Sequence, residues 1–312
     1  MRTVVTGAGG FIGSRLAARL LDEGHEVVGI DRLSDSYDPE RKRAALRALE
    51  ERPGFRALTG DLNELDLREV LAGADTVFHL AAQPGVRASW GSEFGIYLAD
   101  NVHATQRLLE ALSALGGGRL VFASSSSVYG DAKSYPTAET ATPSPISPYG
   151  VTKLAAEHLC RMYARAGVET VILRYFTIFG PGQRPDMAFA RFIDAALEGR
   201  ELEILGDGRQ VRDFTYVDDA VAATIAAGEH GRPGEVYNVA GGTQASVLDV
   251  IEVLEELLNT PVKRRHLPAA AGDVQRTSAD SSKARSELGF APRVGLAEGL
   301  REQLAAHRAA IG

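Results

Sequence analysis

The chain has 312 residues, 45% of them hydrophobic, and its 34 basic and 41 acidic side chains give a net charge of −7 at pH 7. This length is enough to bury the core of one large domain or of two smaller ones, while the acidic balance argues against a general attraction to nucleic acid or anionic membranes. No apolar run approaches the roughly 18 residues of a membrane-spanning helix, and the single cysteine, Cys160, excludes an internal disulfide and fits a reducing compartment. We therefore expect a cytoplasmic protein without nucleic-acid or membrane partners, with the basic runs at 41–43 and 263–265 on its solvated surface.

Short β-rich segments alternate with helical patterns along the first half of the chain. The segments RTVVTG, EVVGID, FRALTGD, TVFHLAA, RLVFASS and TVILRY are apolar without polar alternation, as strands buried on both faces are. The stretches between them are long enough for crossover helices. This pattern predicts an α/β fold with a doubly wound parallel sheet.

Helical periodicity predicts where the main helices lie, at residues 11–23, 101–115, 149–165, 188–197, 247–258 and 296–306. After Arg174 the pattern loosens into the Gly/Pro-rich segment FGPGQRPDM, and a later strand is predicted at EVYNVA. The second half of the chain therefore looks like a smaller domain, with some segments returning to the main sheet.

A glycine-rich loop, TGAGGFIG, follows the first predicted strand directly. Gly7, Gly10 and Gly13 have a G-x-x-G-x-x-G spacing, which suits a tight turn, a close approach of backbone to a pyrophosphate, and a helix N-terminus that favours anions. A plain turn is the alternative, but the position between a strand and an amphipathic helix favours dinucleotide binding. Phe11 and Ile12 belong to the same expected cofactor loop.

The second predicted strand ends at Asp31, where a carboxylate accepts hydrogen bonds from the adenosine ribose and repels a 2′-phosphate. This favours NAD over NADP, although the neighbouring Arg32 could pair with that phosphate. Ligands of such sheets bind at the carboxyl ends of the strands. After the third and fourth strands, further cofactor contacts are therefore expected from Asp61, Leu62, Leu80, Ala81, Ala82 and Gln83, with ordinary turn chemistry as the alternative.

Tyr149 and Lys153 stand four residues apart in SPYGVTKLAAEHL, on one face of a predicted helix. A phenol with an ordinary pKa of about 10 is a poor base at neutral pH, but a neighbouring ammonium and an oxidised nicotinamide both favour the phenolate. Such a pair is usually structural when it stands alone. Together with the glycine loop and the hydroxyls of RLVFASSSSVYG, it predicts a catalytic base.

The glycine loop, Asp31, the serines and the Tyr149–Lys153 pair resemble the extended short-chain dehydrogenase/reductase family of NAD-dependent nucleotide-sugar epimerases and dehydratases. The resemblance covers essentially the whole chain and implies a Rossmann-type sheet with a smaller C-terminal substrate domain. It implies that Tyr149 is the catalytic base, that Lys153 holds the nicotinamide ribose and lowers the pKa of the tyrosine, and that Ser125 hydrogen-bonds the reacting hydroxyl.

The resemblance also suggests domain boundaries and an assembly. We expect an NAD-binding domain of residues 1–173 plus about 212–243, and a nucleotide-sugar-binding domain of about 174–211 plus 244–312. Relatives pair two helices of each subunit into a four-helix bundle, so a homodimer is expected through the helices predicted at 101–115 and 149–165. Additional cofactor contacts are implied for Asn101, Ser124, Tyr175 and Phe176.

The serines after the fifth strand distinguish among members of this family. Dehydratases carry an Asp-Glu pair where Ser126 and Ser127 stand, and decarboxylases carry a Glu at the position of Ser127. Without a carboxylate to move further protons, the simplest fate of a 4-keto sugar is rotation and return of the hydride to its other face, which is 4-epimerisation. The segments HLAAQPGVRASW and GPGQRPDMAFARFI are similar to UDP-glucuronate 4-epimerases.

We therefore expect an enzyme that converts UDP-glucuronate to UDP-galacturonate through a 4-keto intermediate, with hydroxyls of Ser125, Ser126, Ser127 and Thr177 on the substrate carboxylate. UDP-glucose 4-epimerase, UDP-glucuronate decarboxylase and a non-catalytic NAD-sensing scaffold remain alternatives. No metal is expected.

Other substrate contacts are implied near the loop and helix at 184–197 and near the last strands. The expected residues are Arg87, Arg184, Met187, Ala188, Phe189, Arg191, Arg212 and Arg276. Two positions depart from the family: Gly182 and Ala271 stand where relatives often carry arginine, with Arg276 as a candidate substitute for the second. The sequence leaves open which arginine meets the carboxylate and which the diphosphate.

Overall fold

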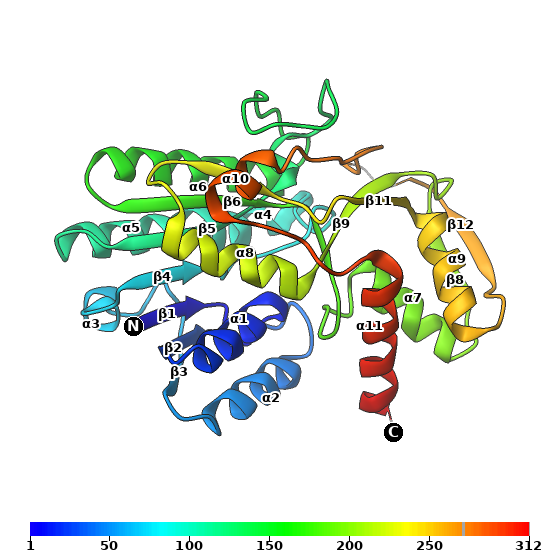
Figure 1. Ribbon diagram of the computed structural model, residues 1–312, viewed down its shortest axis with the longest axis horizontal. Coiled ribbons are helices and arrows are strands. Elements are labelled where there is room, and N and C mark those ends of the chain that lie inside the picture. Colours follow the sequence, from blue (N-terminus) through cyan, green and yellow to red (C-terminus); the bar gives the residue numbers. More distant parts are fainter. Residues whose placement is uncertain (270–271, 312) are drawn as a thin grey trace.

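The computed structural model describes residues 1–269 and 272–311, so Ala271 lies outside the described residues. A seven-stranded sheet in the order β10-β6-β5-β4-β1-β2-β3 forms the larger part (Figure 1), and every neighbouring pair of strands in it is parallel. Its strands are β1 (Arg2–Thr6), β2 (Glu26–Asp31), β3 (Phe55–Thr59), β4 (Thr76–His79), β5 (Arg119–Ser125), β6 (Glu169–Tyr175) and β10 (Val236–Val239). The doubly wound α/β fold predicted from the sequence is confirmed.

Helices cover both faces of this sheet. One face carries α1 (Phe11–Asp22), α2 (Pro39–Glu50), α8 (Val217–His230) and α10 (Ser282–Leu288), and the other carries α3 (Leu67–Leu71), α5 (Ala104–Ala114) and α6 (Pro148–Arg165). Along β5, Val121 belongs to the core beneath α1 and α8, whereas Leu120 and Phe122 belong to the core beneath α5 and α6. Burial on both faces explains why the strand sequences do not alternate with polar residues.

The segment before α5 differs from the predicted helix. Instead of one helix from residue 101, the chain forms η1 (Gly91–Glu93), α4 (Phe94–Tyr97) and a π-helical turn, η2 (Leu98–His103), before α5 begins at Ala104. Apolar spacing reports which face of a helix is buried, and it does not reveal one residue inserted into the hydrogen-bond ladder. Turns of this kind are frequent at functional sites, and η2 carries Asp100 and Asn101.

The smaller part lies at the right of Figure 1. A three-stranded sheet joins β7 (Thr177–Phe179), β9 (Val211–Tyr216) and β11 (Thr243–Ser246), and a two-stranded parallel sheet joins β8 (Leu202–Leu205) to β12 (Arg264–Leu267). Its helices are α7 (Ala188–Leu197), α9 (Val247–Leu258) and α11 (Leu296–Ile311). The first two have the predicted bounds, while α11 continues beyond the predicted end at residue 306.

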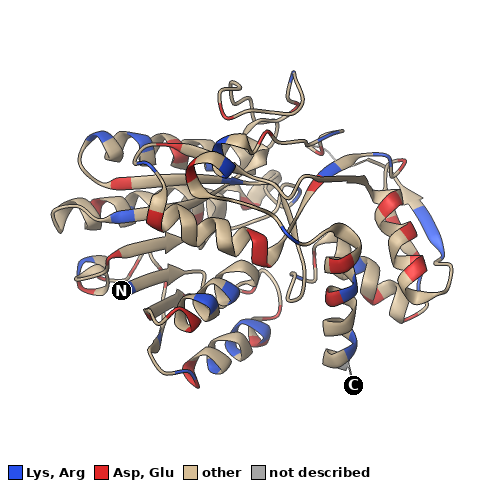
Figure 2. Ribbon diagram, viewed as in Figure 1, with Lys and Arg blue, Asp and Glu red and all other residues tan. Residues whose placement is uncertain are grey.

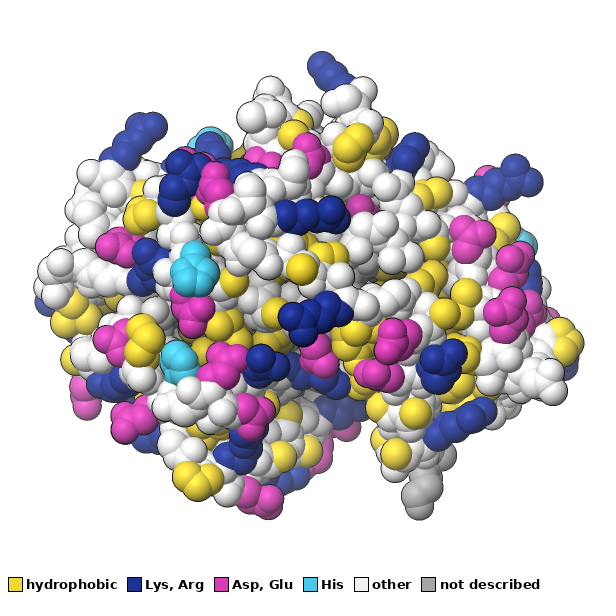
Figure 3. Space-filling view, viewed as in Figure 1, with side chains coloured by type: hydrophobic (Ala, Val, Ile, Leu, Met, Phe, Trp, Pro, Cys, Tyr) yellow, Lys and Arg dark blue, Asp and Glu magenta, His cyan; other side chains and the backbone are white. Residues whose placement is uncertain are grey.

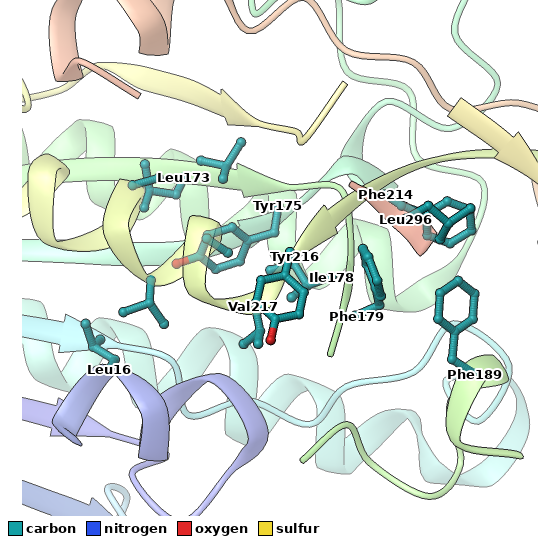
Figure 4. Close-up of a cluster of buried hydrophobic side chains, with 14 of the residues drawn as sticks. Leu16, Leu173, Tyr175, Ile178, Phe179, Phe189, Phe214, Tyr216, Val217 and Leu296 are labelled. Carbon is teal, nitrogen blue, oxygen red and sulfur yellow. The ribbon is translucent and has the colours of Figure 1, made fainter. Parts of the chain in front are cut away.

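One hydrophobic core joins the two parts (Figure 4). It runs from Leu16 of α1 through Tyr175 at the end of β6 to an aromatic group in the smaller part, where the ring of Phe179 meets Phe189 and Phe214 at centroid distances of 5.3 and 6.0 Å. Edge-to-face packing of this kind adds to the stabilisation from burial. The predicted division into two domains stays a prediction: β9 lies in the small sheet, while β10 returns to the main one.

Charged residues of both signs are interspersed along the helices (Figure 2), and the face seen in Figure 3 mixes charged and hydrophobic side chains. No helix within residues 1–269 and 272–311 combines the length and apolar character needed to cross a bilayer. The same residues contain no cluster of three or more His, Cys, Asp or Glu side chains suited to a metal ion.

Candidate active site

Two adjoining pockets open at the carboxyl ends of the strands of the main sheet. The first pocket is lined by the loops after β1 to β4, and the second lies between the end of β5, the start of α6 and the smaller part. They share the residues Ile12, Pro84, Ser124, Tyr149, Tyr175 and Arg184. The tyrosine predicted to be the catalytic base therefore lies where the two pockets meet.

The glycine loop forms the floor of the first pocket. Gly7 has a left-handed φ of 73°, and a Cβ there would lie 2.9 Å from the backbone nitrogen of Ala81. A Cβ on Gly13 would lie 2.1 Å from the carbonyl oxygen of Gly7, so α1 can approach β1 only with glycine at this position. No side chain caps the N-terminus of α1 at Gly10, which leaves its amide groups available to an anion.

Asp31 is fixed at the end of β2 by two backbone amides. Its Oδ2 accepts a hydrogen bond from the Gly9 nitrogen at 3.0 Å, and its Oδ1 accepts one from the Leu33 nitrogen at 2.8 Å. Asn63, also in the lining, has a buried Oδ1 without a hydrogen-bond partner among the described residues. This acceptor suits a donor such as the amino group of adenine. The loop, the carboxylate and this free acceptor together fit a dinucleotide.

Arg32 is held by two carboxylates. Its guanidinium donates to both carboxylate oxygens of Asp100, at 2.7 and 2.5 Å, and to Asp61 Oδ2 at 3.1 Å. Burial raises the pKa of Asp100 even though Arg32 opposes the shift. Burial also acts to raise the pKa of Asp61, but the Asn63 amide and the Arg32 guanidinium bring it below its ordinary value.

Lys42 is a first-pocket residue that sequence reasoning missed, because it lies in the basic run assigned to the solvated surface. It is buried, its Nζ donates to the carbonyl and hydroxyl oxygens of Ser34 at 2.8 Å each, and Nζ lies 4.5 Å from the centroid of the Tyr37 ring. Burial lowers its pKa. Lys42 stands four residues before Leu46, so both lie on the same face of α2. This spacing was the signal in the sequence that Lys42 is buried.

Most of the predicted cofactor contacts line the first pocket. These are Gly7, Gly10, Phe11, Ile12, Gly13, Asp31, Arg32, Asp61, Leu62, Leu80, Ala81, Ala82, Ser124, Tyr149, Lys153 and Tyr175. Phe176 lines the second pocket instead. Gln83 and Asn101 line neither pocket: the Asn101 carboxamide binds the backbone nitrogen and oxygen of Gln83 at 2.8 and 3.1 Å and the Thr152 hydroxyl at 3.0 Å. Asn101 thus ties the loop after β4 to α6.

Helix α6 begins where its sequence contains the signals for an N-terminus. The Ser147 hydroxyl accepts a hydrogen bond from the Gly150 nitrogen at 3.1 Å, and Pro148 occupies the first helical position. Tyr149 therefore projects from the first turn. Its ring packs edge-on against Tyr97 at a centroid distance of 6.3 Å.

The electrostatics of the catalytic candidates are set mainly by burial. Burial raises the pKa of Tyr149, while the Ser125 hydroxyl and the positive charge of Arg184 act in the opposite direction. Burial lowers the pKa of Lys153 to about 8, and its Nζ donates to the Ala123 carbonyl oxygen at 2.9 Å. The predicted lowering of the Tyr149 pKa by Lys153 stays a prediction.

The four serines at 124–127, of which the first two end β5, make different contacts. Ser125, Ser126 and Ser127 all line the second pocket, where the short helix η3 (Ser126–Val128) follows the strand, and the Ser125 Oγ accepts a hydrogen bond from the Ser127 nitrogen and donates to its Oγ, at 3.1 Å each. Ser124 lines both pockets, and its hydroxyl donates to Glu157 Oε1 at 2.5 Å.

Glu157 belongs to a buried ion pair beneath these serines. Its carboxylate accepts two hydrogen bonds from Arg174, at 2.9 and 2.7 Å, and the two side chains are 2% and 1% exposed. The guanidinium lies 4.6 Å from the centroid of the Tyr129 ring. This pair was not predicted from the sequence, although Glu157, four residues after Lys153, lies on the same face of α6 as the lysine.

Two predicted substrate arginines line the second pocket together with Thr177 and Met187. Arg184 forms a two-pronged ion pair with Asp186, at 2.9 and 2.8 Å, and Arg212 binds Asp273 Oδ1 at 2.5 Å. Both arginines are therefore already oriented by a carboxylate at the edge of the pocket.

The other predicted substrate residues lie outside the lining of both pockets. Arg87 and Arg191 are near Arg212 and Asp273, whose charges all act on Arg87, while burial lowers the pKa of Arg87. Arg276 is exposed and donates to Gln244 Oε1 at 2.8 Å. Ala188 is exposed at the start of α7, and Phe189 is buried in the aromatic core.

Known proteins are similar to the chain over nearly all of its length. The profile of the NAD dependent epimerase/dehydratase family matches residues 3–240. The chain is 44% identical to an uncharacterized UDP-glucose epimerase of Bacillus subtilis over 98% of this chain and 97% of that protein. It is 38% identical to the UDP-glucuronate 4-epimerase of Thermodesulfobacterium geofontis over 96% of this chain and 93% of that protein.

The same similarity is seen in three dimensions. The structure matches the crystal structure of the UDP-glucuronic acid 4-epimerase of Bacillus cereus in complex with UDP-glucuronic acid and NAD, with a TM-score of 0.97 and 43% identity. The match covers 99% of this chain and 100% of that chain.

Proposed function

Because the chain belongs to the NAD-dependent epimerase/dehydratase family, we propose that it is a UDP-glucuronate 4-epimerase, which interconverts UDP-glucuronate and UDP-galacturonate with no net oxidation. The observation that carries this proposal is the set of hydroxyls beside Tyr149 in the second pocket, namely Ser125, Ser126, Ser127 and Thr177. The B. cereus enzyme, with a TM-score of 0.97, is a UDP-glucuronic acid 4-epimerase that holds both UDP-glucuronic acid and NAD.

The glycine loop and Asp31 of the first pocket would hold NAD, which would supply the acceptor for the C4 hydrogen and later its donor. Tyr149 takes the proton of the 4-hydroxyl as general base, and Ser125 hydrogen-bonds the same oxygen. Lys153 supplies positive charge that favours the phenolate. On the return step Tyr149 gives the proton back, so no group is consumed.

The described lining of the second pocket offers no acid–base pair to carry the 4-keto sugar further. Among the described residues of its lining, the one carboxylate is Asp273, and that carboxylate accepts a hydrogen bond from Arg212. Elimination of water across C5 and C6 needs a general acid and a base beside those carbons. This lining therefore favours rotation of the keto sugar followed by reduction on its other face, which is epimerisation at C4.

A uronate oxidised at C4 is a β-keto acid, which loses CO₂ when the C5–C6 bond aligns with the carbonyl π system. An epimerase must therefore hold the carboxylate out of that alignment. Hydroxyl donors on Ser126, Ser127 and Thr177 suit this task, because several directional hydrogen bonds fix the carboxylate plane. An aspartate or glutamate in their place would repel it.

The diphosphate of the substrate is assigned to the arginines around Asp273. Arg212 lines the second pocket, and Arg87 and Arg191 are near enough to it for their charges to interact. Planar guanidinium groups bind phosphate oxygens with two hydrogen bonds each. Arg184, beside Tyr149 and shared by both pockets, is assigned to the uronate end.

We also propose that the protein is a cytoplasmic homodimer. Both η2 and α6 carry exposed apolar side chains, with Leu98, Val151 and Met162 at 45%, 47% and 55% exposed. Apolar groups of this kind on neighbouring helices are typical of a helix-bundle interface. The buried single cysteine, Cys160, fits a reducing compartment.

The test is product analysis after the purified protein is incubated separately with UDP-glucuronate and UDP-glucose. We expect UDP-galacturonate from the first and little turnover of the second. The 44% identity to a UDP-glucose epimerase makes UDP-galactose the alternative product, and it would show a UDP-glucose 4-epimerase. A UDP-pentose would show a decarboxylase, and NAD binding without turnover of either sugar would show an NAD-sensing scaffold.

A further inference from the structure

The adenosine end of the first pocket contains more charge than binding of NAD requires. Asp31, Asp61 and Asp100 supply three carboxylates there, and Arg32 and Lys42 supply two cations. The arginine directly follows Asp31 at the end of β2, so a phosphate on the ribose 2′-oxygen would meet both side chains. A free guanidinium at this position is the usual device for accepting NADP.

The contacts of Arg32 show why it is not free. Both carboxylate oxygens of Asp100 accept from it, at 2.7 and 2.5 Å, and the Asp100 side chain is only 9% exposed. Two-pronged, charge-assisted pairs of this kind are the strong ones. Asp61 adds only one contact, at 3.1 Å, and its other oxygen accepts from the Asn63 nitrogen at 2.8 Å.

The π-helical turn η2 gives Asp100 this position. Within that turn the next residue, Asn101, is 1% exposed and binds the loop after β4 and α6. Next to the fixed Asn101, Asp100 lines the first pocket. Lys42, the second cation, is likewise occupied, by Ser34 and by Ser36 Oγ at 3.4 Å.

We propose that Asp100 is a specificity-determining residue, which keeps the first pocket selective for NAD by withdrawing Arg32 from the ribose 2′-position. The repulsion between Asp31 and a 2′-phosphate then has no compensating partner. This inference rests on the use of NAD in the proposed function. It predicts that two residues, Asp31 and Asp100, disfavour NADP, and only Asp31 could be recognised from the sequence pattern.

The test is a competition experiment on the full-length protein. Each variant is equilibrated with a known mixture of NAD⁺ and NADP⁺, and the nucleotides that remain bound after separation are quantified. Asp100→Asn should raise the bound ratio of NADP to NAD by about tenfold, as expected when one charge-assisted contact to the phosphate becomes available. Asp100→Glu keeps a carboxylate that can pair with the Arg32 guanidinium, so its bound ratio of NADP to NAD should stay within about threefold of the wild type.

The arginine variants separate release of Arg32 from simple loss of a negative charge. Arg32→Ala should leave the ratio within about threefold of the wild type, and the double variant Asp100→Asn/Arg32→Ala should lose the gain of the single one. An unchanged ratio in Asp100→Asn would overturn the proposal, as would a gain that persists in the double variant. Melting temperatures identify any variant that fails to fold, and Asp100→Ala then serves as the second release variant under the same criteria.

This result and the fate of the proposed function are distinguishable, because the competition measures binding and needs no sugar substrate. A wild-type protein that binds NAD and shows the predicted ratios but does not convert UDP-glucuronate would contradict only the proposed function. A wild-type protein that binds neither nucleotide would overturn both.

Discussion

Lys153 provides a stability prediction whose size follows from its burial. The side chain is 3% exposed, and burial lowers its pKa from 10.5 to about 8. Its pKa in the unfolded chain is the ordinary value, so between pH 8 and 10.5 the unfolded state binds more protons than the folded one. Stability therefore rises with pH across this interval. The penalty for burying the charged lysine acts in full below about pH 8 and is relieved above about pH 10.5.

The shift corresponds to roughly 3 kcal/mol against folding at neutral pH, since one pKa unit is about 1.4 kcal/mol. Replacement by methionine keeps an unbranched apolar stem and removes the charge. It also removes the hydrogen bond to the Ala123 carbonyl oxygen, which contributes about 1 to 2 kcal/mol. Lys153→Met should therefore be about 1 to 2 kcal/mol more stable than the wild type at pH 7, while it loses most of its activity.

The assay is urea unfolding of the full-length wild type and variant, both freed of nucleotide, at pH 7 and pH 9.5. Other titrating groups cancel in the difference between the two proteins. We expect the free energy of unfolding of the wild type, relative to the variant, to rise by about 2 kcal/mol over this interval. A difference that does not change with pH, or a variant less stable than the wild type at pH 7, would refute the reasoning.

Three further predictions concern the second pocket and the buried pair beneath it. Tyr149→Phe should lower kcat at least about 100-fold with an unchanged melting temperature, because only the proton-carrying oxygen is removed; undiminished turnover would exclude Tyr149 as the base. Ser126→Ala and Ser127→Ala should each raise KM for UDP-glucuronate about tenfold and release some CO₂ and UDP-pentose, measured by headspace CO₂ and chromatography; if neither changes, these serines do not hold the carboxylate. Glu157→Gln should lower the free energy of unfolding by about 3 kcal/mol, because Arg174 is left buried without its counter-charge; a loss below about 1 kcal/mol in urea unfolding would mean that water reaches this pair.

Much of the fold follows from local patterns. Apolar runs predicted the strands of the main sheet up to β6, and periodicity predicted α7 and α9 with the bounds they have. The burial of these segments produces apolar runs in the strands and a helical spacing of apolar residues in the helices, and both patterns are visible in the sequence. The π-helical turn before α5 leaves no such trace, and its Asn101 is held by the loop after β4 and by α6, which are distant in sequence.

The candidate site shows the same division. The glycine loop and the Tyr149–Lys153 pair have a spacing that the chemistry requires, and so they were identified from the sequence. Two buried charged residues near them were missed: Lys42 was assigned to a surface run, and Glu157 was not singled out. Arg32 was noted as a possible partner of a 2′-phosphate, but its pairing with Asp100 depends on a contact across 68 positions. Such contacts follow from the tertiary fold and from no local pattern.

The substrate-binding residues were the least predictable group. Phe189 is buried in the aromatic core, and Arg276, expected to substitute for the arginine that relatives carry at position 271, contacts Gln244 on the surface. Their proposed substrate contacts stay predictions. A motif position fixes the backbone more closely than the direction of a long side chain.

The central claim is that the sugar is epimerised at C4 by removal and return of the same hydrogen. The most direct measurement is to incubate the protein with UDP-glucuronate deuterated at C4 in ordinary water and to determine the deuterium content of the products by NMR and mass spectrometry. The account predicts UDP-galacturonate that retains the deuterium at C4. Loss of the deuterium to solvent, or a UDP-pentose as the main product, would contradict it.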